Sequence, residues 1–553
     1  MADTYKVFPS IGVARVGNSE EIGNHYYLAP ETSGGLPIKP GTENTPITEN
    51  DLRDSQGKLK REGARFRVFC YPDGGGEPYE VLPESGIKIK WTVHLANKKA
   101  AWYKFKPVEG EGIYPPNTEL RNPGVTDRAS LIIDPGPRTL DSPGQSASFS
   151  RNSDSRGYKM SFPEKLSPFE IDTLGEIRTD DKGRLIVIGG LGHSGTLDSY
   201  PPTSPDNDLD YANNDNWWDD TSDGPVSATV ILNNGVEIEA ASAWVIVTPP
   251  AYAPEILAQI TMYDVMFDVA VRKLGYRPDI YNNGYQTSYI TQRETEIERI
   301  LNRALLYKWV VADHGSCHIF DYENPANVRK WMRSPAQVNE HGSGPGLMPM
   351  LAGDESANPQ GTSQYVSFTE TQIFFADQWN SGKFTTGNIP QEKAPDILTR
   401  AALDNCSGAA FAPGIEMTWF SRRSEIYTEA FRLKKRDYGN SLSTSATPLA
   451  EGLEPGDFLK FMALPWQADF NECAVQEISG EKVNWWPAQR MLRVHRDGTK
   501  NNPWVGTDQI GADDYLRFKF NAQMVNDWSK LGFVLNVGTE QEPKFEEVQR
   551  TLT

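Results

Sequence analysis

Residues 243–247 read Ala243-Trp244-Val245-Ile246-Val247, and the character of the chain changes just after them. A short apolar run rich in β-branched and aromatic residues predicts a strand. Similar runs recur upstream, separated by stretches rich in Gly, Pro, Asn and Asp; they lie at 6–16, 65–70, 87–94, 184–188 and 228–232. Residues 1–250 are therefore predicted to form a β-rich subdomain.

Beyond residue 250 a helical period replaces the strand pattern. Apolar residues at helical spacing predict one helix over about 253–275 and another over about 291–311. A third, shorter helix is predicted over 395–405, because Pro395 suits a first helical turn. A chain of 553 residues exceeds the ~250–300 residues that one core usually serves. We therefore expect an α+β fold in which residues 251–553 form a second, mixed subdomain.

The composition excludes several classes of function. A formal charge of −19 and a pI near 5.0 argue against binding to nucleic acid or to an anionic membrane. The four cysteines, Cys70, Cys317, Cys406 and Cys473, contain no CxxC pair and indicate neither a disulfide framework nor a zinc ribbon. No apolar run reaches ~18 residues and the N-terminus does not resemble a signal peptide, so a soluble protein made in the cytoplasm is expected.

Three motifs resemble ligand sites but have a simpler interpretation. Residues 190–195 fit the GxGxxG spelling, but Pro201 and Pro202 break the helix that a dinucleotide site requires, so a glycine turn is favoured. Residues 206–220 are rich in carboxylates but lack the Gly and Glu of an EF-hand, which favours a solvated loop. The group at 314–318, with two His and one Cys, lacks a second ligand pair, so no metal is expected. A papain-like signature is missing around Cys317 and Cys406.

Two separated segments carry the residues of greatest chemical interest. Cys406 follows the predicted helix 395–405 and enters the turn Ser407-Gly408, whereas Trp466 directly follows Pro465. Taken alone, such a cysteine is usually a small buried residue and such a tryptophan a packing aromatic.

Together with four other blocks, these segments resemble the bacterial L-lysine ε-oxidase and glycine oxidase family of cysteine tryptophylquinone enzymes. The blocks are FPSIGVARVG (8–17), LANKKAAW (95–102), IIDPGPR (132–138), DDTSDGP (219–225), PGIE (413–416) and LPWQADF (464–470). Six dispersed blocks in the same order are a specific signal, because a motif needs its context.

The resemblance implies a cofactor made from the chain itself, cysteine tryptophylquinone, in which the oxygenated ring of Trp466 is joined by a thioether to Cys406. Such a quinone is an electrophile that accepts a primary amine, while a protein base removes a proton from the adjacent carbon. The family's reaction releases an aldehyde or keto acid and ammonia, and O2 becomes hydrogen peroxide. A separate flavoprotein matures the cofactor.

The base should be a carboxylate whose pKa is raised in a water-poor pocket. Asp404 lies closest to Cys406 in sequence and is the first candidate, with a role at the helix C-terminus as its alternative. Asp469 and Glu416 are the other candidates, because each flanks a crosslink partner.

The amino-acid or amine substrate is not determined by the sequence. A substrate carboxylate would suit an arginine fork, and the candidates between the two cofactor residues are Arg422, Arg423 and Arg432. The resemblance also implies a homo-oligomer and permits export without a leader. Two other functions are compatible with the same fold: a binding or structural module without a matured cofactor, and a quinone enzyme with non-oxidase chemistry.

Overall fold

The computed structural model describes residues 3–83, 86–105, 119–200, 208–311, 320–338, 346–353, 364–387, 389, 391–408, 415–416, 419–478, 480–505 and 517–552. Within these ranges one mixed sheet of 13 strands dominates the first half of the chain. Its strands are β1 (Thr4–Phe8), β2 (Ile11–Arg15), β3 (Tyr26–Leu28), β4 (Arg61–Tyr71), β5 (Tyr79–Glu80), β6 (Lys88–Val93), β7 (Arg138–Leu140), β8 (Ser146–Ser150), β10 (Thr173–Thr179), β11 (Leu185–Ile188), β14 (Ser222–Ile231), β15 (Glu237–Glu239) and β16 (Ala243–Thr248). The strand runs predicted from the sequence are confirmed.

The strand order explains why the sheet is a single unit. Its main path runs β7-β6-β14-β16-β2-β4-β11-β10-β8, while β1, β3 and β5 pair with β4 and β15 pairs with β14. The central pair, β16 and β2, is parallel, with Trp244 opposite Ile11 and Thr248 opposite Arg15. The second strand of the chain, β2, therefore lies beside the last strand of the sheet, β16, about 230 residues later in the chain.

Smaller strand groups surround this sheet. A three-stranded group contains β9 (Ser167–Pro168), β12 (Ser194–Thr196) and β13 (Trp217–Asp219). The later pairs are β17 (Thr291–Gln292) with β18 (Phe384–Thr385), β19 (Tyr427–Glu429) with β20 (Arg432–Leu433), β21 (Val475–Ile478) with β22 (Glu481–Asn484), β23 (Arg493–Arg496) with β24 (Thr499–Pro503), and β25 (Phe533–Asn536) with β26 (Phe545–Val548).

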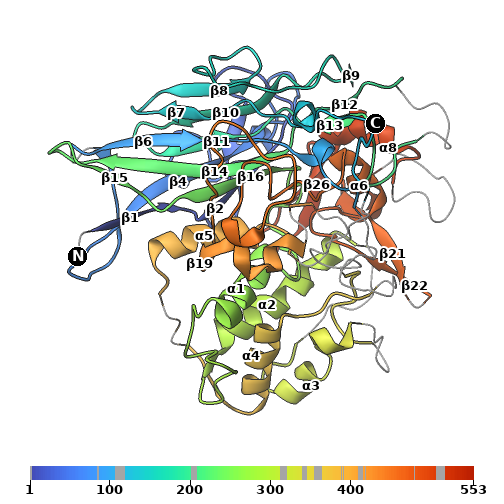
Figure 1. Ribbon diagram of the computed structural model, residues 1–553. Helices are drawn as coiled ribbons and strands as arrows, with labels where there is room; N and C mark the ends of the chain where they lie inside the picture. Colours follow the sequence, from blue (N-terminus) through green and yellow to red (C-terminus); the bar gives the residue numbers. More distant parts are fainter. Residues whose placement is uncertain are drawn as a thin grey trace.

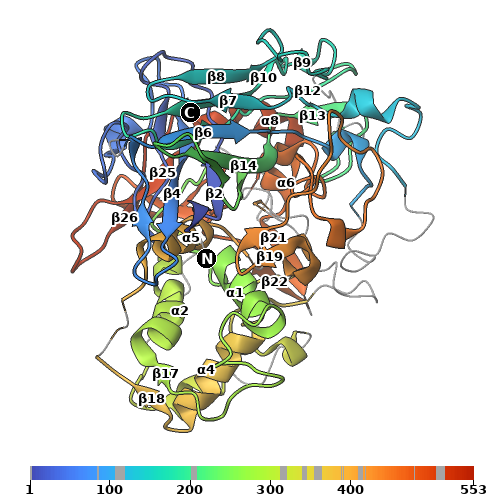
Figure 2. The same ribbon diagram turned by 60° about the vertical axis from the view of Figure 1, so that its left-hand side comes forward.

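The helices lie mainly in the second half of the chain. They are α1 (Met262–Lys273), α2 (Arg299–Leu301), α3 (Pro325–Arg329), α4 (Glu370–Asn380), α5 (Ala394–Asp404), α6 (Trp466–Glu472) and α8 (Asn521–Asp527). In both ribbon views α1 to α4 form a layer on one side of the sheet, and α6 and α8 lie beside β12 and β13 (Figures 1 and 2). The fold is α+β, as expected.

Two helix boundaries differ from the prediction. The first helix begins at Met262 rather than near 253, because the Thr261 hydroxyl and the Asp264 side chain cap each other's backbone N–H groups. The predicted helix at 291–311 is a strand followed by a π turn at Glu294–Glu298, the short α2, and a 3-10 segment at Asn302–Trp309. The helix predicted at 395–405 is confirmed as α5.

Strands β2 and β16 separate two hydrophobic cores. Because side chains alternate along a strand, Val13, Trp244 and Ile246 pack with the helices α1, α4 and α5. The alternate residues of the same strands, among them Ala14 and Val247, pack in a second core with Trp466 and the C-terminal residues. The second half of the chain thus contributes to both cores. The subdomain boundary at residue 250 stays a prediction.

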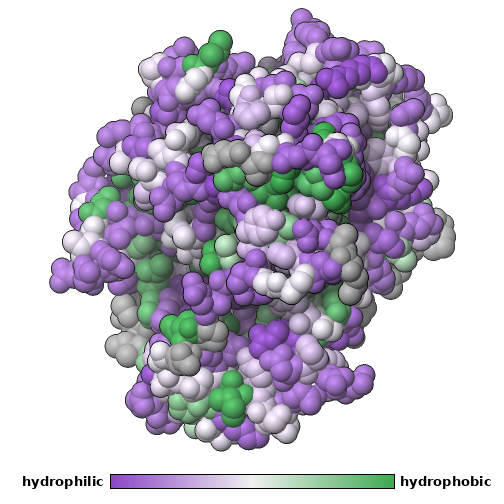
Figure 3. Space-filling view, turned by 90° about the vertical axis from the view of Figure 1, so that its left-hand side faces the viewer, coloured by the Kyte–Doolittle hydropathy of each residue, from purple (hydrophilic) through white to green (hydrophobic). Residues whose placement is uncertain are grey.

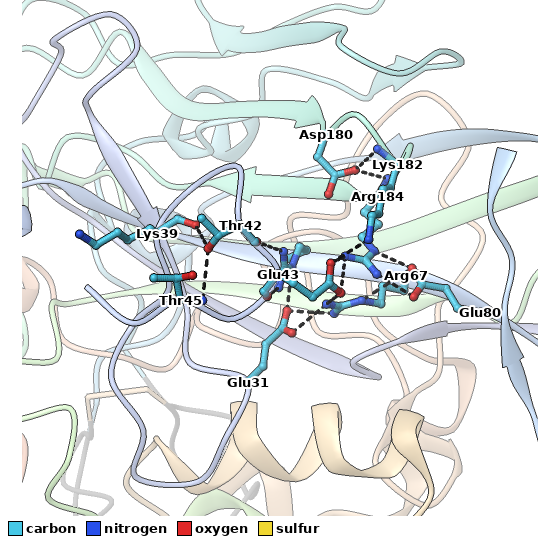
Figure 4. A network of polar contacts seen from close by, with 11 residues as sticks. Glu31, Lys39, Thr42, Glu43, Thr45, Arg67, Glu80, Asp180, Lys182 and Arg184 are labelled. Atoms are coloured by element: carbon cyan, nitrogen blue, oxygen red, sulfur yellow. Dashed lines mark hydrogen bonds and ion pairs between the residues drawn. The ribbon is translucent and has the colours of Figure 1, made fainter. Parts of the chain in front are cut away.

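A polar network fixes the loop around residues 31–45 on the sheet (Figure 4). It joins arginines of β4 and of the turn before β11 to glutamates of neighbouring segments: Arg65, Arg67 and Arg184 with Glu31, Glu43 and Glu80. Arg67 binds both oxygens of Glu31, at 2.9 and 2.8 Å. A paired geometry of this kind is the strong form of an ion pair, so the loop is anchored by charge rather than by apolar contact.

The surface agrees with the low mean hydropathy of −0.54. The face drawn in Figure 3 is mostly hydrophilic, and apolar side chains gather there only in small patches. Among the helices of the described ranges, none is long and apolar enough to cross a membrane.

Candidate functional site

Trp466 lines a small cavity between the sheet and α6. The cavity has a volume of about 10 Å³, and most of its wall is apolar, with Ile415, Leu459, Met462 and Phe470 among the lining residues. Its polar lining residues are Lys99, Thr221, Thr248 and Asp469. A charged group in such a space is largely shielded from water, so its pKa depends on its immediate neighbours.

Trp466 is the first residue of α6 and is held at both its backbone and its ring. Its backbone N–H donates to the Asp219 carboxylate at 3.1 Å. Its ring meets Trp528 and Phe470 edge to face, with centroid distances of 5.5 and 5.7 Å. The indole Nε1 is buried and has no hydrogen-bond partner among the described residues. Buried tryptophan N–H groups usually have a hydrogen-bond partner, so the Trp466 N–H is available to a group that the described residues do not supply.

Asp469 lies one turn further along α6, on the same face as Trp466 because three residues separate them. The side chain is 2% exposed, and one carboxylate oxygen, Oδ1, has no partner among the described residues. Burial raises the pKa of Asp469 well above its usual range, and a hydrogen bond from Cys473 and the charge of Lys99 oppose the shift only in part. A carboxylate of this kind can accept a proton at neutral pH.

Asp219 is a fully bonded carboxylate beneath the start of α6. Lys99 Nζ lies 2.8 Å from its Oδ2, and Oδ1 accepts hydrogen bonds from Asn97 Nδ2 at 2.9 Å and from Thr221 Oγ1 at 2.8 Å. Burial lowers the pKa of the Lys99 ammonium group, and the negative charge of Asp219 offsets part of this lowering. Lys99 is a site residue that the sequence analysis missed; its signal was two lysines within the apolar block at 95–102.

Asp219 also corrects the interpretation of residues 206–220 as a solvated loop. Asp219 and its neighbour Asp220 are 0% and 1% exposed, because β13 and the turn after it run under α6 and against residues 190–193. The Asp220 carboxylate accepts the backbone N–H of Leu191 at 2.6 Å. Residues 190–193 join β11 to β12, so a strand rather than a helix follows them, and the tight glycine turn expected there stays a prediction.

Cys406 lies just beyond α5 in a second, charged cluster. Arg15 at the end of β2 donates to the Asn405 carbonyl at 2.9 Å, and the same Nη2 atom lies 3.7 Å from Cys406 Sγ. Its Nη1 lies 3.0 Å from Glu416, whose other oxygen accepts the Ser407 backbone N–H at 3.1 Å. Burial and the Glu416 carboxylate raise the pKa of the Cys406 thiol well above its usual value, and Arg15 opposes both.

The two clusters share one wall. Arg15 Nη1 also donates to the Pro249 carbonyl at 2.9 Å and to Thr248 Oγ1 at 3.3 Å, and both residues line the cavity at Trp466. Ile415 lines the same cavity and directly precedes Glu416 in the chain. The structure therefore places Cys406 and Glu416 in the layer next to the cavity that holds Trp466 and Asp469.

Asp404 faces a different environment. Its oxygens accept from Ser33 at 2.7 Å and Thr261 at 2.9 Å, and Arg299 and Arg303 lie 3.3 and 3.4 Å away. Burial alone would raise the pKa of Asp404, but the two arginines outweigh it and lower the pKa. Asp404 ties α5 to α1 and α2. Its role as a base stays a prediction that this geometry does not favour.

The three arginine candidates for a substrate carboxylate lie elsewhere. Arg432 is 3% exposed and binds Glu429 together with the carbonyls of Val7 and Ser242. Arg423 pairs with Glu425 on the surface at 2.9 Å, and Arg422 lines a separate cavity beside α1 and α4. None of the three lines the cavity at Trp466, so a substrate-binding role stays a prediction without geometric support.

No group of three or more potential metal ligands occurs in the part of the chain that the structure describes. The residues His314, Cys317 and His318 lie outside that part. The residues around the cavity fit a cofactor made from the chain itself: a buried thiol at Cys406, a buried indole at Trp466 with an unpaired N–H, and an unpaired carboxylate oxygen at Asp469.

Two family models match most of the chain. The model of the L-lysine ε-oxidase N-terminal domain matches residues 8–247, and that of the C-terminal domain matches residues 349–488. The L-lysine 6-oxidase of Marinomonas mediterranea is 33% identical over 535 residues, which cover 86% of this chain and 71% of that protein.

Solved structures extend the comparison to the fold. The crystal structure of the L-Lys ε-oxidase from Marinomonas mediterranea matches with a TM-score of 0.84 at 27% identity, covering 99% of this chain and 95% of that one. The structure of its Schiff base intermediate with L-Lys matches with the same score and coverage at 28% identity. With both domain models matched and identity extending over most of its length, this chain belongs to the L-lysine ε-oxidase family.

Proposed function

We propose that the protein is an amino-acid oxidase that deaminates its substrate and transfers two electrons to O2. The balanced reaction consumes the amino acid, O2 and water and yields an aldehyde or keto acid, ammonia and hydrogen peroxide. The observation that supports it most strongly is the pairing of Trp466 with Asp469 in one small, water-poor cavity. An aromatic ring next to a carboxylate of raised pKa suits removal of a proton from carbon.

The cofactor that we propose is cysteine tryptophylquinone, formed from Trp466 and Cys406. When matured, this group supplies an electrophilic carbonyl for the substrate amine and a sink for two electrons. Trp528 and Phe470 hold the ring from the side, and the bond from the Trp466 backbone N–H to Asp219 fixes the start of α6. Cys406 contributes a tether rather than a nucleophile, because a thioether has no thiol proton to lose.

Asp469 is the residue that we propose as the proton acceptor. Its unpaired oxygen belongs to a side chain on the cavity wall, and its raised pKa makes the protonated form accessible during turnover. Glu416 is the alternative, although Arg15 already binds one of its oxygens and the Ser407 N–H the other. Asp404 is held by two arginines and is a structural carboxylate in this scheme.

Lys99 has a positioning role in the same scheme. Its ammonium group lies against Asp219, which in turn holds the first residue of α6. Since Lys99 also lines the cavity, it places a positive charge near Asp469 without neutralising it. This cation limits how far the pKa of Asp469 rises.

The test combines mass spectrometry with a substrate screen. The protein is purified from its own producer, or after co-expression with the maturing flavoprotein, and digested with trypsin. One crosslinked peptide containing Cys406 and Trp466, with the mass of two added oxygens less the hydrogens lost, is expected. Peroxide release is then measured across amino acids and simple primary amines.

Each outcome of this test has one interpretation. Crosslinked protein that releases peroxide with an amino acid supports the proposal. Crosslinked protein that releases none with any amine would instead indicate quinone chemistry other than oxidation. Separate, unmodified peptides from matured material would mean a module that keeps the fold without the cofactor.

A further inference from the structure

We infer that Arg15 is the residue that positions and activates the sulfur of Cys406 for thioether formation, with Glu416 as the acceptor of the thiol proton. This inference rests on the cofactor proposed above and goes beyond it, since it concerns how the crosslink is made. Arg15 lies in the block at 8–17, more than 390 residues from Cys406 in sequence.

The guanidinium of Arg15 contacts the backbone just before Cys406 and the sulfur of Cys406 itself. Nη2 donates to the carbonyl of the preceding residue, Asn405, at 2.9 Å and lies 3.7 Å from the sulfur itself. The thiol donates to the Ala402 carbonyl at 3.4 Å, within α5. Nη2 therefore holds both the carbonyl just before Cys406 and the sulfur, while Nη1 holds Glu416. A lysine has only one nitrogen for these contacts.

The same arginine holds two carboxylates. Nη1 lies 3.0 Å from Glu416, and Nε lies 3.6 Å from Glu62 of β4. All three side chains are at most 6% exposed. With one cation and two buried carboxylates, the cluster would carry a net negative charge if both carboxylates were ionised. Burial disfavours such a charge, so one of the two carboxylates can hold a proton. Burial raises the pKa of Glu62 to about 7 and also raises the pKa of Glu416, with Arg15 opposing both shifts.

The chemistry of the step follows from this arrangement. The Cys406 thiol transfers its proton to Glu416, and Arg15 stabilises the thiolate that remains. The sulfur lone pair forms the C–S bond to a carbon of an indole ring already oxidised to the quinone level by the O2-dependent flavoprotein. The C–H bond at that carbon breaks, its proton and the proton held by Glu416 pass to the ring oxygens, and the ring gains two electrons. O2 then takes up those two electrons as hydrogen peroxide, which regenerates the quinone state. Without Arg15 the buried thiol would have a still higher pKa and a smaller thiolate fraction.

The experiment follows crosslinking directly rather than activity. Wild type, Arg15→Lys and Glu416→Gln are each co-expressed with the flavoprotein, and samples are taken over time. The crosslinked fraction is measured by peptide mass and by alkylation of the free Cys406 thiol after denaturation. Arg333→Lys is the matched control, because Arg333 is also buried but binds the carbonyls of Pro349, Gln337 and Leu347, and it does not line the cavity at Trp466.

Arg15→Lys and Glu416→Gln are expected to slow crosslinking by roughly tenfold to a hundredfold, the effect of losing one charge-assisted hydrogen bond. Protein with an oxygenated Trp466 and a free thiol should accumulate, and the crosslinking rate of Arg15→Lys should recover at higher pH, where more thiolate forms. Arg333→Lys should crosslink at the wild-type rate.

Two results would overturn the inference. One is wild-type crosslinking rates in both Arg15→Lys and Glu416→Gln. The other is equal slowing in Arg333→Lys, which would mean that lost stability alone explains the effect. Should Arg15→Lys fail to fold, Glu416→Gln decides, since it keeps the side-chain shape and an oxygen for the Ser407 N–H. An uncrosslinked wild type would instead reject the proposed cofactor, so the two failures are distinguishable.

Discussion

The contrast between Asp404 and Asp469 shows how the surroundings of a residue decide its chemistry. Both carboxylates are almost fully buried. Two arginines and two hydroxyl groups stabilise the charge of Asp404 and lower its pKa, whereas Asp469 has an unpaired oxygen and a raised pKa. Only the second is prepared to take up and release a proton near neutral pH.

Asp469→Asn is expected to lower the turnover number by about 10²- to 10⁴-fold, the usual effect of removing a general base. In the wild type, turnover should rise with pH as Asp469 loses its proton, at a pH above the ordinary range for aspartate. The variant should lose this pH dependence. Turnover is measured on material whose crosslink has been verified by mass, and a variant that keeps full activity would assign the proton transfer to another group.

The same variant should be more stable than the wild type at pH 7. Because the folded-state pKa of Asp469 is raised, the folded protein holds a proton that the unfolded chain releases, and stability falls as pH rises above about 4. An asparagine removes this cost. Asp404→Asn should do the reverse, because its pKa is lowered by ion pairs that the amide loses. Thermal unfolding of both variants at pH 7 checks the opposite signs.

At the scale of elements, α6 is held against residues 190–193. Gln467 Nε2 donates to the Gly192 carbonyl at 3.0 Å, and Ser194 Oγ donates to Gln467 Oε1 at 2.6 Å. Gly192 has a φ of +72°, and a Cβ atom there would lie 2.1 Å from the ring of Trp528. That ring in turn contacts Trp466, so residues 190–193 support the Trp466 ring through one intervening residue.

Gly192→Ala should therefore displace Trp528 and disturb Trp466. A loss of stability of about 1–3 kcal/mol is expected from the combined strain and overpacking, with a lower crosslinked fraction because the indole is misplaced. Gly235→Ala is the control: Gly235 also has a positive φ, of +82°, but a Cβ atom there would meet none of the described residues within 4 Å. Equal crosslinking in the two variants would contradict the support role of residues 190–193.

The network on β4 predicts a specific loss of stability in acid. Hydrogen bonds from Arg184 and Lys182 lower the pKa of Glu43 to about 2. The contribution of Glu43 to the free energy of unfolding is complete above about pH 4.5, the pKa of this group in the unfolded chain. It is lost as the pH falls towards about 2, the pKa in the folded protein. Glu43 is half exposed, so Glu43→Gln should cost only about 0.5–1 kcal/mol at pH 7.

Urea unfolding at pH 7 and pH 3 measures this contribution. The difference between wild type and Glu43→Gln should shrink at pH 3, because the unfolded chain then takes up a proton at Glu43 that the folded protein largely does not hold. Glu540→Gln, at an exposed position, should show no such change. A gap between wild type and Glu43→Gln that does not depend on pH would mean that the network contributes through packing.

At the scale of the whole molecule, the two hydrophobic cores are coupled through shared strands. Val245 of β16 belongs to the core that contains Trp466, and its neighbour Ile246 belongs to the helical core. Because β16 contributes side chains to both cores, a loss of packing in one core also disturbs the strand that packs in the other. Cores linked in this way should unfold together.

Val245→Ala and Ile246→Ala are therefore expected to shift one common unfolding transition. The free energy of unfolding of each variant should fall by about 2–4 kcal/mol, the cost of a cavity at a fully buried position. Circular dichroism and tryptophan fluorescence should give coincident curves in both variants. Two separate transitions, each moved by only one of the variants, would instead support independent subdomains divided near residue 250.

The sequence alone determined those features of this protein that depend on neighbouring residues. Short apolar runs rich in β-branched and aromatic residues predicted β4, β6, β11, β14 and β16. Pro395 predicted the start of α5, because strand propensity and first-turn chemistry are local. The six blocks between residues 8 and 470 identified the family, because each block is a short run of neighbouring residues. The start of α1 was missed, since Pro254 resembles a helix start and the Thr261–Asp264 capping pair was overlooked.

Only the tertiary structure decided which charged groups surround Cys406 and Trp466. Arg15 meets Cys406, and Lys99 meets Asp219, across long stretches of chain. The sequence ranked Asp404 above Asp469 because it is adjacent to Cys406, but adjacency does not report burial or pairing. Whether a buried carboxylate is ionised depends on the cations and donors that folding brings to it, and those come from distant strands and helices.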